Sequence, residues 1–435
     1  MHQIVIIGGG AGGLELATRL GDRLGKRKKA KIVLVDRHPV HVWKPLLHEV
    51  AAGSMDPFTH QLEYAAQARW HSFEFQLGEL IALDRGVKTV TLAAAYDEEG
   101  IELLPSRTLK YDTLVIAIGS TTNYFNVPGA QQYALALDTA AQAEHFRRRL
   151  IATCMRAQAH MDDGASRPAA RIQIAIVGGG ATGVELSAEL RQTAQVLAAY
   201  GIHTLDPKRD IGIVVIESGS RILSALPERV SAETAALLTK LGIELRAGEH
   251  VTEVLPNALR TASGKTLSAD LIVWAAGIQA PAVLKQLDGL ATTPRGQLKV
   301  RTTLQTENDD DIFAFGDCAS CPWPQHNSTV PPRAQAAHQQ ANFLLPLLPR
   351  RLASASASLP TFRYRDFGSL VSLGRFSAVG HLLGGNLLVE GIFARWMYAF
   401  LYRMHIAALH GVPRMALDTL AHWLRRSTLP RVKLH

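Results

Sequence analysis

Cysteine is scarce in this sequence, with three residues in a chain of 435. A small and odd number of cysteines argues against a disulfide framework and favours a reducing compartment. Long apolar runs are also missing: no window of about 18 uncharged apolar residues occurs, so we expect no membrane-spanning helix. A strand is predicted almost at Met1, and we therefore expect no signal or transit peptide.

Charged residues make up 19% of the chain and apolar residues 47%, which is ordinary for a globular α/β protein. The length allows two or three domains with full cores. Acidic residues are scarce at the end, where residues 391–435 carry seven Arg or Lys and one Asp, so most of the net charge of +8 lies there. No motif for DNA or RNA accompanies this charge, and we expect no nucleic-acid partner.

One glycine-rich phrase occurs twice, at residues 8–13 and 178–183, each time after a β-branched run. Gly-x-Gly-x-x-Gly after a strand gives a tight turn, a close backbone approach to a pyrophosphate and a helix packing contact. The following helix directs its free N–H groups at the phosphates. The sequence therefore predicts two dinucleotide sites, with the glycines Gly8, Gly10 and Gly13 in the first and Gly178, Gly180 and Gly183 in the second.

An acidic residue ends the next predicted strand of each unit, Asp36 in the first and Glu217 in the second. A carboxylate there binds ribose hydroxyls and repels a 2′-phosphate, which favours NADH over NADPH. Glu217 lies farther from its glycines than the usual separation of about 20 residues, and residues 200–209 look like an insertion. The nearby Arg221 weakens the inference against NADPH, and a solvated strand end is the alternative reading of each acid.

Three further buried strands are predicted to end at glycine: residues 110–118 before Gly119, 270–276 before Gly277, and 312–315 before Gly316-Asp317. Alternating polar and apolar residues at 73–77 and 89–92 predict a small antiparallel insertion in the first unit. We expect a loop at 161–171 and a low-complexity linker at 353–358.

The basic C-terminal region contains two apolar stripes with helical spacing. The first stripe is Phe393, Trp396, Met397, Phe400, Leu401 and Met404, and the second is Ala416, Leu417, Leu420, Trp423 and Leu424. Amphipathic basic helices of this kind lie in the plane of an anionic bilayer surface, or they pack on the protein core or a second subunit. The pattern leaves these alternatives open.

The paired glycine motifs, the strand ends at Gly119 and Gly277, and Gly316-Asp317 together resemble the two-dinucleotide-binding-domain flavoproteins. Residues 43–50, 178–190 and 331–339 make the whole chain similar to the type II NADH dehydrogenases, which are non-proton-pumping NADH:quinone oxidoreductases. The resemblance implies an α/β fold with two Rossmann-type dinucleotide-binding domains and a C-terminal amphipathic-helix membrane-association region. It divides the chain into an FAD domain at 1–122 and 300–345, an NADH domain at 123–299, and a C-terminal region at 346–435.

The resemblance also implies the reaction: hydride transfer from NADH to FAD, followed by two-electron reduction of a membrane quinone, either ubiquinone or menaquinone. It places the protein peripherally on the cytoplasmic face of a bacterial inner membrane, with a homodimer as a possible arrangement of the C-terminal helices. Without a spanning segment the reaction is expected not to pump protons.

Carried over residue by residue, the family's motifs assign roles to specific side chains. Glu185, Gln335 and Gln339 are the expected catalytic residues, although an acid in the first turn of a helix is also favoured by the helix dipole, and Glu15 holds the equivalent place in the first unit. The FAD residues are Gly8, Gly10, Gly13, Asp36, Lys44, Gly119, Gly316 and Asp317; the NADH residues are Gly178, Gly180, Gly183, Glu185, Glu217 and Gly277; the quinone residues are Gln335, Ala336 and Gln339.

The cysteines argue against related enzyme classes. Dithiol reductases of this superfamily carry a cysteine pair after the first ribose acid, and residues 37–60 contain none. Cys154 and the pair Cys318/Cys321 do not fit the spacing of sulfide:quinone reductases. The C-x-x-C at 318–321 could form a labile disulfide or hold a metal, but half the ligands of a zinc site are missing, and we expect no metal. A soluble NADH oxidase or diaphorase and a non-enzymatic FAD/NADH redox sensor remain alternative functions.

Overall fold

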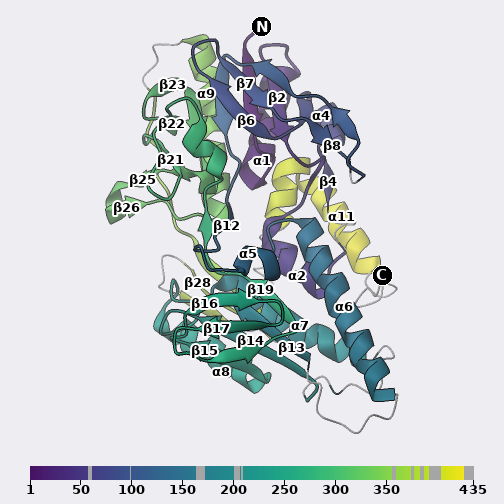
Figure 1. The fold of residues 1–435 in the computed structure, drawn as a ribbon. Coiled ribbons are helices and arrows are strands. Elements are labelled where there is room, and N and C mark those ends of the chain that lie inside the picture. Colours follow the sequence, from purple (N-terminus) through teal and green to yellow (C-terminus); the bar gives the residue numbers. More distant parts are fainter. Residues whose placement is uncertain are drawn as a thin grey trace.

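The computed structural model describes residues 1–56, 61–97, 99–162, 172–199, 206, 209–354, 359–373, 377–382, 387–390 and 403–425. Two α/β units stack one above the other, with α2, α6 and α11 along one side (Figure 1). Most of the predicted loop at 161–171, of the insertion at 200–209 and of the linker at 353–358, and all of the first apolar stripe except Met404, lie outside the described residues.

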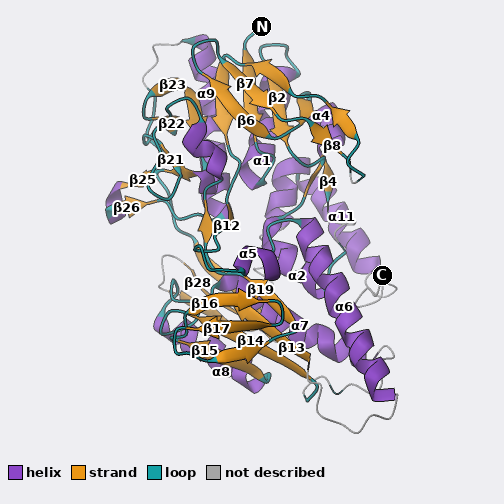
Figure 2. Cartoon of the chain, in the orientation of Figure 1, coloured by secondary structure: helices purple, strands orange, loops and turns teal. Residues whose placement is uncertain are grey.

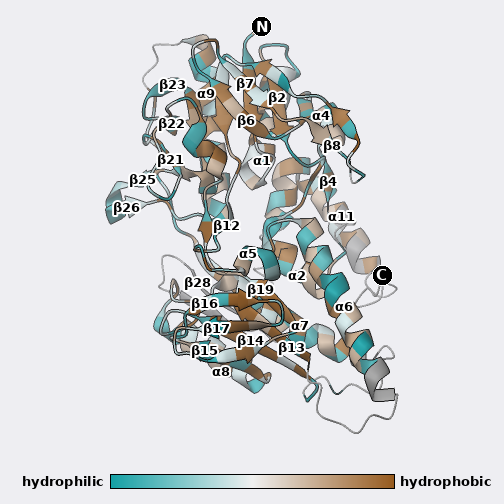
Figure 3. Cartoon of the chain, in the orientation of Figure 1, coloured by the Kyte–Doolittle hydropathy of each residue, from teal (hydrophilic) through white to brown (hydrophobic). Residues whose placement is uncertain are grey.

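The first unit is built on a six-stranded sheet of order β22-β23-β11-β1-β2-β5. All neighbouring pairs are parallel except β22 with β23. The central strands are β-branched and buried, as expected for a sheet covered on both faces, and they are the most apolar part of the unit (Figure 3). Their bounds are β1 Gln3–Ile7, β2 Lys31–Asp36, β5 Glu74–Leu77, β11 Thr113–Ile116, β22 Gln305–Thr306 and β23 Asp309–Ala314.

The predicted antiparallel insertion is confirmed for 89–92 and wrong for 73–77. Strands β6 (Leu80–Asp84), β7 (Thr89–Leu92) and β10 (Arg107–Lys110) form an antiparallel sheet of order β10-β7-β6. In contrast, β5 pairs in parallel with β2 at the edge of the main sheet. An edge strand that is only partly covered also alternates in polarity, so its pattern resembles that of an exposed hairpin.

The second unit repeats this design with a parallel sheet of order β15-β14-β13-β19. The strands are β13 Ile172–Val177, β14 Ile211–Glu217, β15 Ile243–Ala247 and β19 Leu271–Trp274, and the helices are α7 Ala181–Ala199 and α8 Glu228–Lys240. A small sheet of β16 (Val251–Leu255), β17 (Ala258–Thr261) and β18 (Thr266–Ser268) packs at its side.

The chain passes from the first unit to the second at β12 (Thr121–Thr122) and returns at β20 (Ile278–Gln279), and these two strands pair with each other in antiparallel fashion. After β20 the apolar side chains of Ala280, Leu284, Leu287, Leu290 and Leu298 pack into the core of the first unit. The predicted domain boundary at residue 299 therefore differs from the packing, which changes units near residue 279. Local sequence does not reveal this, because apolar residues of a loop fit either core.

The C-terminal part lies against both units. Helix α9 (Ala334–Ala353) packs on α1 (Ala11–Leu20), whereas β27 (Gly368–Leu373) packs on α7. Residues 403–410 are helical and precede α11 (Val412–Arg425). Within the described residues, no helix is long and apolar enough to cross a membrane.

Shorter or peripheral elements complete the fold (Figure 2). They are β3 Val40–His41, η2 Lys44–Leu46, α2 Leu47–Ala52, β4 Leu62–Glu63, α4 Tyr64–His71, β8 Ala95–Tyr96, β9 Glu102–Leu104, α5 Ala130–Tyr133, α6 Ala140–Asp162, η3 Ala282–Gln286, β21 Leu298–Lys299, η4 Gly316–Cys318, β24 Ala319–Ser320, β25 Pro322–Trp323, η5 Pro324–His326, β26 Ser328–Thr329, β28 Ser377–Leu382 and β29 Leu387–Glu390; η1 (Gly21–Gly25) is a π-helical turn.

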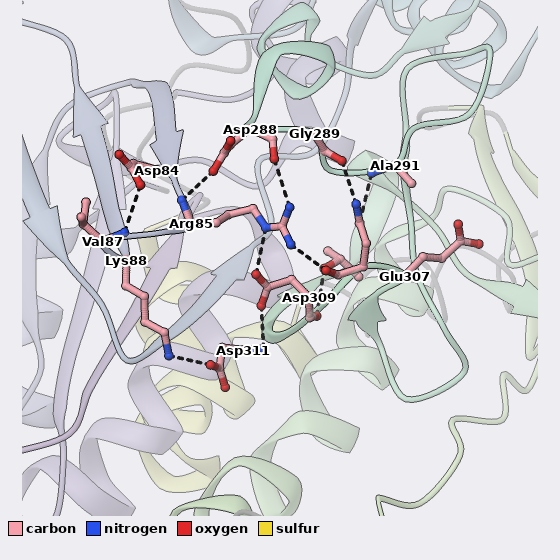
Figure 4. A network of polar contacts seen from close by, with 12 residues as sticks. Asp84, Arg85, Val87, Lys88, Asp288, Gly289, Ala291, Glu307, Asp309 and Asp311 are labelled. Atoms are coloured by element: carbon pink, nitrogen blue, oxygen red, sulfur yellow. Dashed lines mark hydrogen bonds and ion pairs between the residues drawn. The ribbon is translucent and has the colours of Figure 1, made fainter.

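A polar network joins the turn between β6 and β7 to residues 288–311, which belong to the part of the first unit that follows β20 (Figure 4). The Arg85 guanidinium donates to the Asp309 carboxylate at 2.9 Å and to the Asn308 carbonyl at 2.6 Å, while Lys88 pairs with Asp311 at 2.6 Å. The acidic run at 309–311 is therefore matched by cations from a segment more than 200 residues earlier. This network ties both parts of the first unit together at the end of its sheet.

Candidate functional site

The first glycine loop connects β1 to α1 in a conformation that requires glycine. Gly8 has φ +103°, and a Cβ there would lie 2.4 Å from the Ala117 carbonyl oxygen. A Cβ on Gly13 would lie 1.9 Å from the carbonyl oxygen of Gly8. These backbone contacts hold the loop tightly against the ends of β1 and β11, as a dinucleotide-binding turn requires.

The loop leaves space where a pyrophosphate would lie. A Cβ built on Gly10 meets no atom within 4 Å, and Gly10 is the N-cap of α1 without any side-chain cap. The N–H of Gly9 donates to the Asp36 carboxylate at 2.7 Å, which fixes that acid beside the loop. An open helix N-terminus next to a positioned carboxylate fits the phosphate and ribose of a bound nucleotide.

The second loop has the same geometry. Gly178 has φ +113°, a Cβ on Gly183 would lie 2.0 Å from the Gly178 carbonyl oxygen, and a Cβ on Gly180 meets nothing within 4 Å. The Gly179 N–H donates to the Glu217 carboxylate at 2.7 Å, matching Gly9 and Asp36. Glu217 therefore lies beside the second loop as Asp36 lies beside the first, despite its long sequence separation, because β14 follows the insertion in register with β13.

Arg221 is held away from the ribose position by its own loop. Its guanidinium donates to three backbone carbonyls, those of Leu223, Ser224 and Leu226, at 3.2, 2.9 and 3.0 Å. A guanidinium committed to three carbonyls is not free to bind a 2′-phosphate without breaking those bonds. Arg221 therefore no longer weakens the preference for NADH over NADPH that Glu217 predicts.

Lys44, Ser120 and Asp317 lie together beyond the end of β11. The Ser120 hydroxyl donates to the Asp317 carboxylate at 2.8 Å, and the Lys44 ammonium lies 3.4 Å from the Ser120 carbonyl oxygen. Burial raises the pKa of Asp317, and the Ser120 hydrogen bond and the Lys44 charge oppose this. Gly119, with φ +69°, has open space at its Cβ position, whereas a Cβ on Gly277 would lie 2.3 Å from the Phe125 ring.

The sequence analysis missed Gln340, which connects α9 to the Gly316-Asp317 motif. Its side-chain oxygen accepts a hydrogen bond from the Gly316 N–H at 2.9 Å, and the side chain is 2% exposed. The sequence instead predicted a functional role for the adjacent Gln339. The sequence does not distinguish Gln340 from Gln339, because the packing of α9 decides which of the two amides is buried.

Glu185 is buried in the second unit, between α2 and β27. Its carboxylate accepts a hydrogen bond from the Ser372 N–H of β27 at 3.0 Å and lies 3.5 Å from the Nδ1 atom of His48 in α2. Burial lowers the pKa of His48 to about 4, so the imidazole is neutral near pH 7. The structure therefore brings together Glu185 and residues 43–50, two motifs far apart in sequence.

Glu15 occupies the equivalent turn of α1 but has different partners. It accepts from Arg19 at 2.9 Å and lies 2.6 Å from Nδ1 of His338 in α9. Each helix acid therefore fixes a different C-terminal element, α9 in the first unit and β27 in the second. Neither acid lies in the first turn of its helix, so the alternative explanation by the helix dipole is wrong for both.

Gln335 and Gln339 lie one turn apart on α9, as predicted, with both amides bonded to the following segment. Gln335 donates to the Gly368 carbonyl at 2.8 Å and accepts from the Phe367 N–H at 3.2 Å. Gln339 donates to the Arg365 carbonyl at 2.8 Å and accepts from the Arg365 N–H at 3.0 Å. Ala336 is 2% exposed and packs in the core of the first unit, and its contact with a quinone stays a prediction.

All three cysteines are free and buried. Burial raises the thiol pKa of Cys318 and Cys321 to about 12 and that of Cys154 to about 11, which suppresses the reactive thiolate. Among the described residues, no cluster of three or more His, Cys, Asp or Glu side chains is arranged to hold a metal. The C-x-x-C pair thus acts as part of the packed core.

His41 is expected to make the fold sensitive to acid. Burial lowers its folded-state pKa to about 4, below the ordinary value of 6.5, so the unfolded chain binds more protons between these values. The free energy of unfolding should fall as the pH drops from 6.5 towards 4, by up to roughly 3 kcal/mol for this imidazole. Urea unfolding at pH 7, 6 and 5 measures this slope. His41→Gln should reduce the slope by about one proton; an unchanged slope would contradict the assignment.

Comparison with known proteins now adds to this geometry. A profile of the pyridine nucleotide-disulphide oxidoreductase family matches residues 2–341. A Haemophilus influenzae protein named type II NADH:quinone oxidoreductase is 44% identical, with each chain covered over 100% of its length. This chain belongs to the type II NADH:quinone oxidoreductases.

More distant members of the family agree with this membership. The Mycobacterium tuberculosis protein named type II NADH:quinone oxidoreductase Ndh is 26% identical over 97% of this chain and 87% of its own. The structure of NDH2 from Plasmodium falciparum in complex with NADH superposes with a TM-score of 0.84 at 19% identity, covering 100% of this chain and 99% of that one. The type II fold is thus shared over the full length.

Proposed function

We propose that this chain oxidises NADH and reduces a quinone, with FAD on the first glycine loop and NADH on the second. The observation that carries the proposal is the matched pair of loops. In each loop an acid accepts a hydrogen bond from a glycine N–H, that of Gly9 or Gly179, and the Cβ position of the next glycine lies in open space. Two such loops in one chain provide one site for a nucleotide that stays bound as a cofactor and one site for a nucleotide that exchanges as a substrate. Family membership supports NADH and a flavin, and the loop geometry supports FAD because a dinucleotide has the pyrophosphate that it fits.

Bound FAD would supply the redox chemistry, by accepting a hydride and passing two electrons onward. The chain supplies binding and orientation. Asp36 and Glu217 bind ribose hydroxyls, Gly8, Gly10, Gly13, Gly178, Gly180 and Gly183 shape the phosphate loops, and the group of Lys44, Gly119, Gly316 and Asp317 lines the path from the first loop towards the ring. Asp317, whose pKa is raised by burial, is well suited to hydrogen-bond a ribityl hydroxyl there.

Glu185 and Gly277 would position the nicotinamide. Glu185 is the fifth residue of α7, and it is bonded to β27 while facing α2. It therefore fixes three segments around the place where the nicotinamide end of the nucleotide is expected. Holding the reacting groups in one orientation accounts for a large part of such a rate enhancement.

Steady-state assays test the proposed function directly. Purified protein should release FAD on denaturation and should oxidise NADH much faster with a short-chain quinone than without one, with NADPH a poor substrate. A bound flavin other than FAD, or equal rates with NADPH, would contradict the assignment of the two loops.

We assign the direct contact with the quinone to Gln339. Its amide nitrogen has a second N–H beyond the one bonded to Arg365, whereas the second N–H of Gln335 is directed at Asp366 at 3.4 Å. In the described part of the chain this second N–H has no partner, so it can bind a quinone carbonyl, while Gln335 keeps residues 365–368 in place. Either ubiquinone or menaquinone has the carbonyl that this contact needs.

Gln339→Leu is expected to raise the KM for quinone about tenfold, the effect of losing one hydrogen bond of about 1.4 kcal/mol. Flavin reduction by NADH should be unchanged. Gln335→Leu is the matched control, because it removes the same number of backbone hydrogen bonds without removing the free donor. Equal effects of both substitutions on KM would reduce Gln339 to a structural role.

We propose that α11 docks on the surface of an anionic bilayer. The lipid-soluble quinone is dissolved in that bilayer. Leu417, Leu420 and Leu424 follow one face of this helix and are 67%, 53% and 60% exposed. Arg414 lies on the same helix, 6.0 Å from the ring of the exposed Trp70. An apolar face on a helix that also carries Arg414 matches an interfacial helix, and the surface would be the cytoplasmic face of a bacterial inner membrane.

Replacing Leu417, Leu420 and Leu424 with serine should reduce binding to anionic vesicles by at least tenfold, since each exposed leucine would bury apolar area in the bilayer. Vesicle sedimentation measures the loss, and size-exclusion chromatography reports whether a homodimer covers this face instead. A variant that changes from dimer to monomer with unchanged vesicle binding would assign the face to a second copy.

A further inference from the structure

The helix at residues 403–410 is packed into the first unit beside its glycine loop. His405, Ile406 and Leu409 are 6%, 8% and 1% exposed. The His405 ring stacks on Trp43 with centroids 4.1 Å apart, and the His410 ring lies 3.0 Å from the Gln67 amide. This helix directly precedes α11, so the proposed bilayer helix is continuous in sequence with a segment buried in the nucleotide unit.

A chain of hydrogen bonds runs from His405 to the glycine loop. The Nδ1 atom of His41 lies 2.9 Å from the Gly9 carbonyl oxygen, and its Nε2 atom lies 3.0 Å from Nε2 of His405. A carbonyl only accepts, so Nδ1 of His41 carries the proton. Burial keeps His41 neutral by lowering its pKa to about 4, which leaves Nε2 bare and requires His405 to donate.

The chain of hydrogen bonds ends at Gly9, a residue of the first glycine loop. Gly9 lies between the strained Gly8 and the open Gly10, and its N–H holds the Asp36 carboxylate. The Tyr64 hydroxyl donates to the same Gly9 carbonyl at 2.7 Å. His41, 4% exposed, is therefore oriented on one side by the loop and on the other by His405, which is the side-chain partner of its Nε2 atom in the described part of the chain.

We propose that His405 is a positioning residue for the flavin-nucleotide loop, so that docking of helix 403–410 and retention of FAD stabilise each other. His405 fixes the His41 ring, which fixes the Gly9 peptide, which sets the direction of the loop N–H groups and of Asp36. Linkage makes the effect reciprocal: whatever the docked helix adds to FAD affinity, bound FAD adds to helix docking. The inference rests on the proposed seat of FAD on the first loop.

The test compares His405→Ala with His410→Ala in the full-length holoenzyme. Each substitution removes an imidazole that contacts two side chains of the first unit, His41 and Trp43 for His405 and Gln67 and Trp70 for His410. Only His405 leads to Gly9. The FAD dissociation constant, measured by flavin fluorescence, should rise about fivefold in His405→Ala, as expected for one lost hydrogen bond, and remain at the wild-type value in His410→Ala. His405→Gln, which retains a donor, should restore most of the affinity.

Amide hydrogen exchange of residues 403–410 with and without FAD gives the reciprocal readout. FAD should slow this exchange in the wild type and in His410→Ala, and less so in His405→Ala. Unchanged FAD affinity in His405→Ala, or equal loss in both variants, would overturn the proposal. A wild-type protein that binds no FAD would instead overturn the proposed function, so the two failures are distinguishable.

Discussion

Gly180→Val is expected to raise the KM for NADH about 100-fold, equivalent to about 2.7 kcal/mol of lost binding, while the bound flavin and the fold remain intact. A Cβ at this position meets no protein atom within 4 Å, so the added methyl groups should not disturb folding. They would occupy the space through which the second loop approaches a pyrophosphate. Any loss of NADH binding must then come from a clash between the valine side chain and the nucleotide.

Gly10→Val is the matched variant, since its Cβ also meets nothing within 4 Å. It should lose flavin during purification, whereas Gly180→Val should keep it. Thermal unfolding of both variants, compared with flavin-depleted wild type, controls for folding. If Gly180→Val bound NADH like the wild type, or lost flavin as Gly10→Val does, the assignment of one nucleotide to each loop would be wrong.

Glu185→Ala is expected to slow the reduction of flavin by NADH about 100-fold, because displacement of reacting groups by about 1 Å has an effect of that size. The substitution leaves the Ser372 N–H without its acceptor and removes the carboxylate that faces His48. Three segments around the nicotinamide position would lose their common contact. Anaerobic stopped-flow absorbance of the flavin measures the rate.

Glu185→Gln separates charge from position, since its amide oxygen still accepts from Ser372. It should retain most of the stability but lose part of the rate. Glu15→Gln is the control, because Glu15 occupies the same turn of the first unit and contacts Arg19 and His338 instead. Equal slowing by Glu185→Gln and Glu15→Gln would show that neither acid acts at the nicotinamide.

The glycine loops and their acids could be predicted from sequence because their geometry is local. A positive φ at Gly8 and Gly178, and backbone contacts under 2.5 Å for a Cβ on Gly13 or Gly183, permit only glycine whatever the rest of the chain does. Parallel strands then bring Asp36 and Glu217 beside the loops. Even the insertion before Glu217 did not hide this, because register within a sheet does not depend on loop length.

Contacts set by distant packing could not be predicted. The partners of Glu15 and Glu185 differ only because α9 covers one unit and β27 the other. The bonds of Gln335 and Gln339 to residues 365–368, and the bond of Gln340 to Gly316, depend on where α9 lies. The parallel pairing of β5 and the packing of residues 280–298 in the first core have the same origin.

Anaerobic mixing of the FAD-loaded protein, first with NADH and then with a short-chain quinone, tests the central claim most directly. The account predicts that NADH bleaches the flavin absorbance completely and that quinone restores it within a turnover, with NADPH much slower in the first step. Flavin that NADH leaves oxidised, or reduced flavin that quinone does not reoxidise, would contradict the account.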